Sequence, residues 1–254
     1  MSQIASQQNP RLKAVRRLHG RRERTRRGCF LAEGEDLIAA AEHAGVPAVE
    51  GFRLVGSGLG NDDFHDVERS ALASVSTLGS GTRVMAVYEQ RWGPALGGLC
   101  VYLHGVGDPG NVGTVLRAAQ AFGASCVALG PGCADPHSPK AVRASMGAIF
   151  ATALARVEDL DELPGERVAL VAGAGEQLRG PAEDDGLEVP LTLLVGAERE
   201  GLPADVLARC ERLAHIPIAT HSLNAAMAAT VALYEMNRRG GRRGGQDTDT
   251  VPAS

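Results

Sequence analysis

The sequence predicts an α/β protein whose larger part is a mostly parallel sheet with helices on both faces. From residue 99 onward, short apolar runs alternate with segments of helical spacing, as in a series of strand–helix units. The apolar runs are nearly continuous, which is typical of strands that are buried on both faces. Residues 1–88 have a different rhythm and are followed by a stretch rich in Gly and Pro, which predicts a separate, smaller α/β unit and a linker.

The first unit, residues 1–88, is predicted to combine helices with two strands. Helical spacing of apolar residues predicts the helices, and runs rich in β-branched residues predict the strands. In chain order the predicted elements are helices over 10–28 and 34–45, a strand over 49–57, a helix over 63–78 and a strand over 81–90. Residues 89–98, which contain "QRWGPALGG", form the predicted linker.

The second unit, residues 99–240, is predicted to carry the parallel sheet. Its predicted strands cover 99–106, 125–130, 151–157, 167–175, 191–196 and 215–218. Its predicted helices cover 111–124, 138–150, 160–163, 203–210 and 222–239. The last residues, 241–254, contain too little apolar material to pack, and we predict that this tail is disordered.

Charge is distributed unevenly along the chain. The formal net charge is −4, yet nine Lys and Arg residues lie between Arg11 and Arg27 and are opposed there only by Glu23. A basic arm on an acidic body is typical of a contact with the phosphate backbone of a nucleic acid. The candidate RNA-binding residues are Arg21, Arg22, Arg24, Arg26 and Arg27. The alternative is a helix face that is simply solvated.

Several protein classes are excluded by composition. No run of 18 apolar residues occurs and the N-terminus lacks an apolar signal segment, so no membrane partner is expected. The five cysteines are scattered and form no Cys-x-x-Cys pair, so we expect no metal site and no disulfide framework. Reduced cysteines favour a cytoplasmic location.

Ligands of parallel α/β sheets bind beyond the carboxyl ends of the strands, so the loops after the strands are the candidate sites. The first loop, "HGVGDPGN", matches G-x-G-x-x-G, but a carboxylate at Asp108 and the missing N–H of Pro109 argue against a pyrophosphate there. Asn111 follows as a helix N-cap or a ligand contact. Arg117 stands in a small, apolar helix, where an arginine is expected to need an anion or an acidic partner.

Two further loops carry polar residues at strand ends. The loop "LLVGAEREGLP" contains Gly196 and Glu198, and Glu198 is expected either to cap the next helix or to accept a hydrogen bond from a ligand or from Arg117. The segment "IPIATHSLNAAMAATVALYE" contains Ser222, a candidate N-cap, and Asn224. Three such loops together favour a binding site.

These motifs resemble those of the SpoU (TrmH-like) RNA ribose 2'-O-methyltransferases of the SPOUT superfamily. The resemblance rests on "DPGNVGTVLRAAQAFGA", "SPKAVRASMGAIF", "LLVGAEREGL" and "IPIATHSLNAAMAATVALYE", in that order. It covers the whole chain and implies a C-terminal trefoil-knotted methyltransferase domain preceded by a small substrate-binding domain similar to the ribosomal protein L30e fold. The stretch "IATH" before "SLN" is shorter here than in many members.

The resemblance also implies the chemistry. S-adenosylmethionine is expected to contact Gly196, Ile216 and Leu223. Arg117 is expected to act on the ribose 2'-hydroxyl of ribosomal or transfer RNA, as a phosphate clamp or as a base, with catalytic support from Asn111, Glu198, Ser222 and Asn224. A homodimer is expected. The alternatives are a non-catalytic RNA-binding or ribosome-assembly protein that keeps the fold, and a nucleotide-dependent oxidoreductase.

Overall fold

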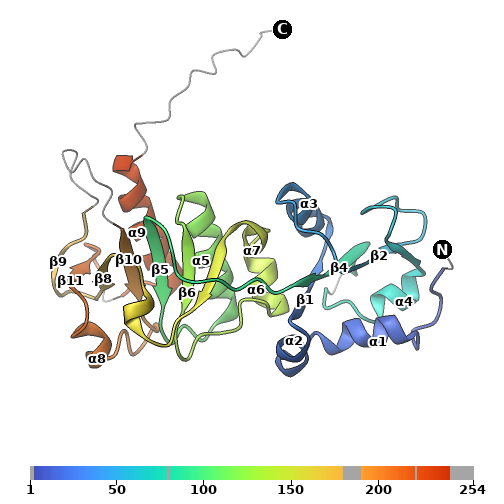
Figure 1. Cartoon of the computed structure of the whole chain (residues 1–254), viewed down its shortest axis with the longest axis horizontal. Helices are drawn as coiled ribbons and strands as arrows, with labels where there is room; N and C mark the ends of the chain where they lie inside the picture. The colour runs from blue at the N-terminus through green and yellow to red at the C-terminus, as the bar shows by residue number, and fades with distance from the viewer. Residues whose placement is uncertain (1–2, 79–80, 180–189, 221, 241–254) are drawn as a thin grey trace, which may run out of the picture.

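The computed structural model of the 254-residue chain describes residues 3–78, 81–179, 190–220 and 222–240. It contains two α/β units side by side, each with its own sheet (Figure 1). The strands of the four-stranded sheet lie within residues 29–89, and those of the seven-stranded sheet lie within residues 99–215.

The smaller unit has a four-stranded sheet in the order β1-β4-β2-β3. Strand β4 pairs antiparallel with both β1 and β2, and β3 pairs parallel to β2. The strands are β1 (Cys29–Glu33), β2 (Glu50–Leu54), β3 (His65–Val67) and β4 (Val84–Glu89). The helices are α1 (Pro10–Arg17), α2 (Arg21–Arg27), α3 (Glu35–His43) and α4 (Arg69–Ala73).

Two helices predicted for this unit are wrong in detail, and one strand was not predicted. The single helix predicted over 10–28 is two helices, because the chain turns at Leu18–Gly20 before α2 begins. Strand β1, which follows directly, was not predicted, since its hydrogen-bonding partner β4 lies more than fifty residues further along the chain. The helix predicted over 63–78 is instead strand β3 followed by the short helix α4.

The larger unit has a seven-stranded sheet in the order β7-β6-β5-β10-β8-β11-β9, and every neighbouring pair in it is parallel. The prediction of a mostly parallel sheet is therefore confirmed. The strands are β5 (Leu99–Leu103), β6 (Cys126–Leu129), β7 (Ala153–Arg156), β8 (Glu166–Leu170), β9 (Glu176–Gln177), β10 (Leu191–Val195) and β11 (Arg212–His215).

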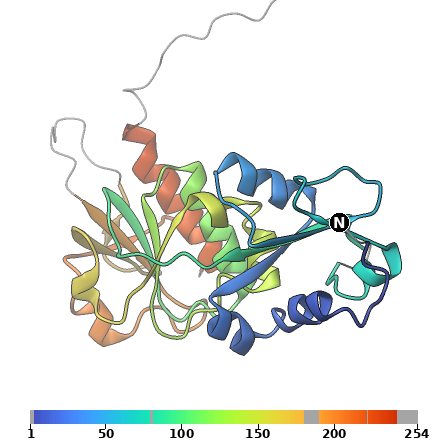
Figure 2. The same ribbon diagram turned by 45° about the vertical axis from the view of Figure 1, so that its right-hand side comes forward.

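The two faces of the large sheet are covered unequally. One face packs on α5 (Pro109–Ala121), α6 (Pro139–Ala144), α7 (Ala148–Ala151) and α9 (Ala225–Gly240), and α5 and α9 lie side by side (Figures 1 and 2). The opposite face packs on the 3-10 turn η1 (Leu160–Glu162) and the short helix α8 (Ala204–Leu207). Among the described residues, no helix combines the length and apolar character that crossing a bilayer requires.

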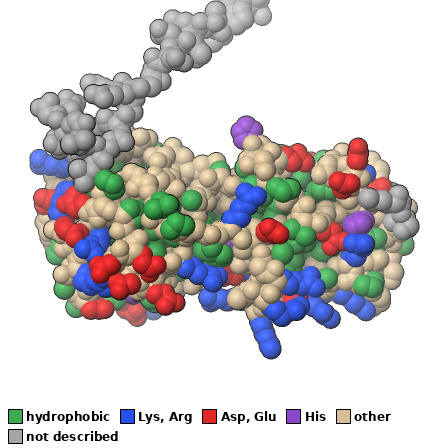
Figure 3. All heavy atoms as spheres, in the orientation of Figure 1, with side chains coloured by type: hydrophobic (Ala, Val, Ile, Leu, Met, Phe, Trp, Pro, Cys, Tyr) green, Lys and Arg blue, Asp and Glu red, His purple; other side chains and the backbone are tan. Residues whose placement is uncertain are grey.

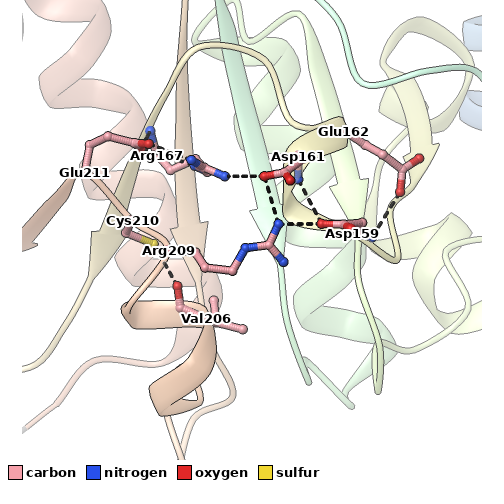
Figure 4. Close-up of polar contacts among 8 residues, drawn as sticks. All are labelled: Asp159, Asp161, Glu162, Arg167, Val206, Arg209, Cys210 and Glu211. Atoms are coloured by element: carbon pink, nitrogen blue, oxygen red, sulfur yellow. Dashed lines mark hydrogen bonds and ion pairs between the residues drawn. The ribbon is translucent and has the colours of Figure 1, made fainter.

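An ion-pair network fastens η1 to the elements beside it (Figure 4). Arg209 contacts the carboxylates of Asp159 and Asp161 at 2.5 and 2.8 Å. Arg167 contacts Glu211 at 2.6 Å and Asp161 at 3.1 Å. A single surface ion pair contributes little to stability. Here Asp161 contacts both Arg167 and Arg209, and this shared partner joins the contacts into one network between η1, β8 and α8.

The larger unit also departs from two predictions. The helix predicted over 138–150 is interrupted between α6 and α7, where Met146 and Gly147 have positive φ angles of 48° and 94°. A left-handed conformation is uncommon for a residue such as methionine, and it turns the chain sharply. The last strand lies earlier than predicted and ends at His215, so Ile216 is the first residue of the following loop.

The apolar core is continuous between the two units. Phe30 and Tyr88 of the smaller sheet contact the Phe150 ring of the larger unit, with ring centroids 5.9 and 4.7 Å apart. In addition, Gly147 lies so close to α3 that a Cβ atom there would overlap the Ala40 side chain. Residues 89–98 therefore connect two units that are already packed together.

A buried ion pair joins the units beside this core. Arg24 of α2 is 3% exposed, and its Nη2 and Nε donate to Asp135 Oδ2 at 2.7 and 2.9 Å. Its Nη1 donates to the carbonyls of Leu18 and His19 at 2.8 and 2.7 Å. Each of the three guanidinium nitrogens thus donates to an acceptor, as a buried charge requires. Removing one partner of such a pair typically costs about 3–5 kcal/mol.

His137 completes the interface. Its ring is buried between Phe30 and Trp92, at centroid distances of 4.8 and 5.2 Å, and its Nδ1 has no hydrogen-bond partner. Burial lowers the pKa of His137 to about 4, against the opposing effect of Asp135. The imidazole is therefore neutral near pH 7 and packs as an aromatic ring.

The close approach at Gly147 predicts a measurable contribution of the interface to stability. Gly147→Ala introduces a strained positive φ and a side-chain overlap with Ala40. Gly123→Ala is the matched control, because Gly123 has a φ of 71° but an added Cβ would meet nothing within 4 Å. We expect Gly123→Ala to lower the free energy of unfolding by about 1–2 kcal/mol, and Gly147→Ala to lower it further. Equal losses in denaturant titrations would contradict a tight contact between the units.

Candidate active site

Three loops meet at the carboxyl edge of the large sheet, and side-chain hydrogen bonds connect them. Asn111, at the start of α5, donates from its Nδ2 to Glu198 in the loop after β10. Asn224, at the start of α9, donates from its Nδ2 to Asn111 Oδ1 at 3.1 Å. Three residues singled out in the sequence therefore form one chain of hydrogen bonds, although they are up to 113 positions apart.

The helix caps differ from those predicted. Helix α5 is capped by Asp108, which accepts from the Asn111 backbone N–H at 3.1 Å, so the Asn111 side chain is free for the site. Asp108 also pairs with Lys140 at 2.6 Å, and this contact lowers the pKa of its carboxyl. Helix α9 begins at Ala225, and Asn224 rather than Ser222 accepts from its first N–H groups, those of Ala226 and Met227, at 2.9 and 3.3 Å. Ser222 is exposed two residues earlier.

Arg117 lies on the exposed side of α5, six residues after Asn111. Gly113, one turn before it, packs so closely on α6 that a Cβ there would overlap Ala141 and Ala144. Close packing of α5 on α6 therefore supports the helix that carries Arg117. Within the described part of the chain, its guanidinium has no hydrogen bond and no ion pair. Because Arg117 is exposed, water solvates its charge, and the acidic protein partner expected from the sequence is not found among these residues.

Two of the three candidate cofactor contacts, Gly196 and Ile216, follow the strands on either side of β8. Strands β10 and β11 both pair with β8, so Gly196 and Ile216, the first residues after them, are two strand spacings or about 10 Å apart. Gly196 permits the tight turn closed by hydrogen bonds between Ala197 and Gly201 at 2.9 and 3.2 Å, since a Cβ at Gly196 would overlap the Gly201 backbone. Leu223 is half-buried directly before Asn224.

His215 provides an independent indication of a ligand at this edge. It ends β11 next to Ile216, and its Nδ1 is buried with no hydrogen-bond partner. Buried polar atoms are nearly always paired in folded proteins, so an unpaired one beside a loop is consistent with a bound molecule. Among the described residues, no group of three or more His, Cys, Asp or Glu side chains is placed to hold a metal ion.

The basic arm separates into two kinds of arginine. Arg21, Arg22, Arg26 and Arg27 are exposed on α2, whereas Arg24 is buried in its ion pair with Asp135. Glu23 contacts Arg26 and Arg27 at 2.6 and 2.8 Å, and the hydrogen bond from Arg26 lowers the pKa of Glu23 to about 2. Lys and Arg side chains gather along the lower side of the smaller unit (Figure 3). The carboxyl ends of the large-sheet strands point to the same side (Figure 1).

A pocket that the sequence analysis did not identify opens beside the loop after β10. Its volume is about 390 Å³, and the loops after β5, β6 and β10 line it. His104 and Glu200 are its titratable residues. Both lie in loops that the sequence predicted as candidate sites, those after β5 and β10. Only the strand order shows that the loop after β6 lies beside these two loops.

The two functions of Asn224 can be separated by substitution. Asn224→Ala removes the N-cap of α9 together with the bond to Asn111, and we expect a loss of about 1 kcal/mol in the free energy of unfolding. Asn224→Asp keeps an oxygen acceptor for the helix N–H groups but has no donor for Asn111, so we expect it to retain more stability than the Ala variant. Thermal and denaturant unfolding measure both. A larger loss for Asn224→Asp would contradict the capping assignment.

Comparisons with known families match both parts of the chain. The model of the SpoU rRNA Methylase family matches residues 98–234. The model of the MRM3-like substrate binding domain matches residues 9–86. The two matches cover the two units seen in the structure.

Individual relatives extend over most of the chain. The 23S rRNA (guanosine(2553)-2'-O)-methyltransferase RlmP of Bacillus subtilis is 30% identical over 249 residues, which are 93% of this chain and 99% of the relative. The 23S rRNA (uridine(2479)-2'-O)-methyltransferase of Streptomyces viridochromogenes is 36% identical over 142 residues, 52% of this chain and 50% of the relative.

Solved structures show the same architecture. An AdoMet-bound rRNA methyltransferase from Sinorhizobium meliloti superimposes with a TM-score of 0.81 at 29% identity, over 94% of this chain and 98% of the other. The SpoU methyltransferase AviRb of Streptomyces viridochromogenes, in complex with AdoMet, gives a TM-score of 0.78 at 27% identity, over 92% and 98% of the two chains. With a matching overall architecture and a family model that covers more than half of its length, the chain belongs to the SpoU rRNA methylase family.

Proposed function

We propose that this protein transfers the methyl group of S-adenosylmethionine to a ribose 2'-hydroxyl of RNA, ribosomal RNA in the first place. The observation that carries the proposal is the chain of hydrogen bonds from Asn224 through Asn111 to Glu198, beside an arginine without a protein partner among the described residues. The family and the named activities of the relatives support it.

The residues around the end of β8 fit the cofactor. Gly196, Ile216 and Leu223 would contact S-adenosylmethionine, mainly through backbone atoms, at the edge where His215 has an unpaired Nδ1. Structures of relatives with AdoMet bound support the cofactor, and the assignment of these three residues is our proposal. When bound, the cofactor supplies a methyl group on a sulfonium, which is already a good leaving group. We also propose the trefoil knot for the chain segments that surround this site.

Arg117 is the residue that we propose acts on the RNA. A guanidinium holds its proton tightly and is a poor base, so Arg117 holds an RNA phosphate and stabilises the negative charge that develops on the 2'-oxygen. Asn111, Glu198 and Asn224 fix the loops around the ribose, and Ser222 lies exposed beside them. Holding the oxygen in line with the methyl group is the larger part of the catalytic task.

The smaller unit holds the RNA in this proposal. The boundary between the units lies within residues 89–98, and the exposed arginines Arg21, Arg22, Arg26 and Arg27 contact the phosphate backbone. Arg24 does not belong to this contact set, because its ion pair with Asp135 buries it. Its role is to fix α2 against the larger unit.

The enzyme acts as a homodimer in this proposal. Met227, Val231 and Tyr234 form a stripe at helical spacing on α9, and they are 58%, 41% and 53% exposed. An exposed apolar stripe of this kind favours a protein partner. It adjoins α5, the helix that carries Arg117, so a second copy on this face would lie next to the active site.

We place the reaction in the cytoplasm, a reducing compartment that suits five free cysteines.

The first test of the proposed function concerns Arg117. We expect Arg117→Ala to lower methyl transfer to ribosomal RNA by about 100-fold or more, because charge stabilisation in the transition state is lost. The affinity for S-adenosylmethionine, measured by calorimetry, should change little. Gln120→Ala, an exposed position one turn later on α5, is the matched control and should keep full activity. Normal turnover by Arg117→Ala would exclude Arg117 from the mechanism.

The second test concerns the arm. We expect the simultaneous change of four residues to Gln, at Arg21, Arg22, Arg26 and Arg27, to weaken RNA binding. The plot of log K against log salt has a negative slope, and its magnitude should fall by up to about 3. Filter binding at several salt concentrations measures the slope. Arg83→Gln, an exposed arginine of the same unit that pairs with Glu35, is the control for a general loss of charge. If the fourfold variant keeps the wild-type slope, the arm is only a solvated surface.

A further inference from the structure

The pocket of about 390 Å³ beside the loop after β10 has a rigid floor. Backbone hydrogen bonds join its three loops: His104 N–H donates to Val195 at 2.9 Å, and Gly105 N–H donates to Pro131 at 2.9 Å. Gly105 lies between its neighbours so closely that a Cβ at Gly132 would be 3.1 Å from the Gly105 Cα. The pocket is therefore preformed.

Two polar side chains, those of His104 and Glu200, line the pocket. Tyr102, which is buried, makes a hydrogen bond of 3.1 Å with His104 Nδ1 and so fixes the orientation of the imidazole. The other ring nitrogen of His104 makes no hydrogen bond with any described residue. The carboxylate of Glu200 likewise has no hydrogen bond and no ion pair within the described ranges. Both groups are free to bind a ligand.

The lining identifies the class of ligand. Neither Lys nor Arg is among the lining residues, so the pocket is unsuited to a phosphate. The remaining walls are small and apolar: Gly105, Pro131, Gly132, Ala197, Gly201 and Pro203. A flat, neutral group with N–H donors fits such a pocket, because an ionised carboxylate only accepts hydrogen bonds. Among RNA bases, guanine presents two adjacent N–H donors on one edge.

The position of the pocket connects it to the rest of the site. The loop after β10 carries Glu198, which bonds Asn111, and Glu200 two residues later. The loop after β6 lines the pocket at Pro131 and Gly132 and reaches Asp135, which is paired with Arg24 of the basic helix α2. The pocket thus shares one loop with the hydrogen-bonded residues of the candidate site and another with the ion pair that holds α2.

We propose that this pocket binds the base of the nucleotide that is methylated, with Glu200 accepting hydrogen bonds from a guanine edge and His104 contacting the same base. The inference rests on the proposed function and deepens it, because it assigns a base preference to the reaction. A base in this pocket must leave its stack, as bases do in enzymes whose chemistry is on the base itself.

The test uses the full chain, S-adenosylmethionine and unmodified ribosomal RNA transcribed in vitro. Initial rates are measured by digesting the RNA to nucleosides and quantifying each 2'-O-methylated nucleoside by mass spectrometry. We expect 2'-O-methylguanosine as the product. Glu200→Gln, which replaces one acceptor oxygen by a donor, and Ala197→Leu, which fills the pocket, should each lower its rate by about 10- to 100-fold.

Two controls separate the pocket from general effects. Glu158→Gln removes an exposed carboxylate of the same unit that does not line the pocket, and it should keep the wild-type rate. Calorimetry with S-adenosylmethionine checks that the pocket variants are folded and bind the cofactor as the wild type does.

The possible failures are distinguishable. Wild-type rates in both pocket variants, or a 2'-O-methyl group on a different nucleoside, would overturn the pocket assignment and leave the proposed function intact. If the wild-type protein forms no 2'-O-methylated nucleoside, the proposed function itself falls and the pocket assignment falls with it.

Discussion

The side-chain amide of Asn111 connects the loops of the candidate active site through two hydrogen bonds. The start of α9 determines the direction of these bonds. The backbone N–H groups at the start of α9 determine that Oδ1 of Asn224 faces the helix. The Nδ2 of Asn224 must then point to Asn111 Oδ1, and the Nδ2 of Asn111 must point to Glu198. A carboxylate that only accepts is a suitable end for such a chain. Only one of its oxygens is used, so the other is free for a substrate group.

A neighbouring loop, the one after β6, depends on the docking of the smaller unit. Asp135 belongs to the loop after β6, and the buried guanidinium of Arg24 fixes that loop to α2. The exposed arginines of α2 are therefore held at a constant position relative to the carboxyl edge. A flexible arm would have to lose conformational entropy when RNA binds, whereas this one has already been ordered by folding.

The periodicity of the sequence was sufficient for the parallel sheet and for the three loops at its edge. It was insufficient wherever a partner lies far away in the chain. Arg24 looks like its neighbours in the sequence, and only the position of Asp135, 111 residues later, distinguishes a buried ion pair from an exposed charge. Strand β1 was missed for the same reason, since pairing with β4 defines it. The cap of α5 is different: Asp108 followed by Pro109 is a local signal of a helix start, and weighing only Asn111 overlooked it.

The strained junction between α6 and α7 connects the interface to catalysis. Met146 has a φ of 48°, a conformation that costs a residue with a Cβ about 1 kcal/mol or more, so the packing on both sides must maintain it. On one side Gly147 contacts α3 of the smaller unit, and on the other the α6 backbone contacts Gly113 of α5. Arg117 is one turn further along α5. Displacing the smaller unit would therefore disturb the helix that carries the arginine. In the proposed function, the unit that holds the RNA and the arginine that acts on its ribose are thus parts of one packed structure, coupled by these glycine contacts as well as by the Arg24–Asp135 ion pair.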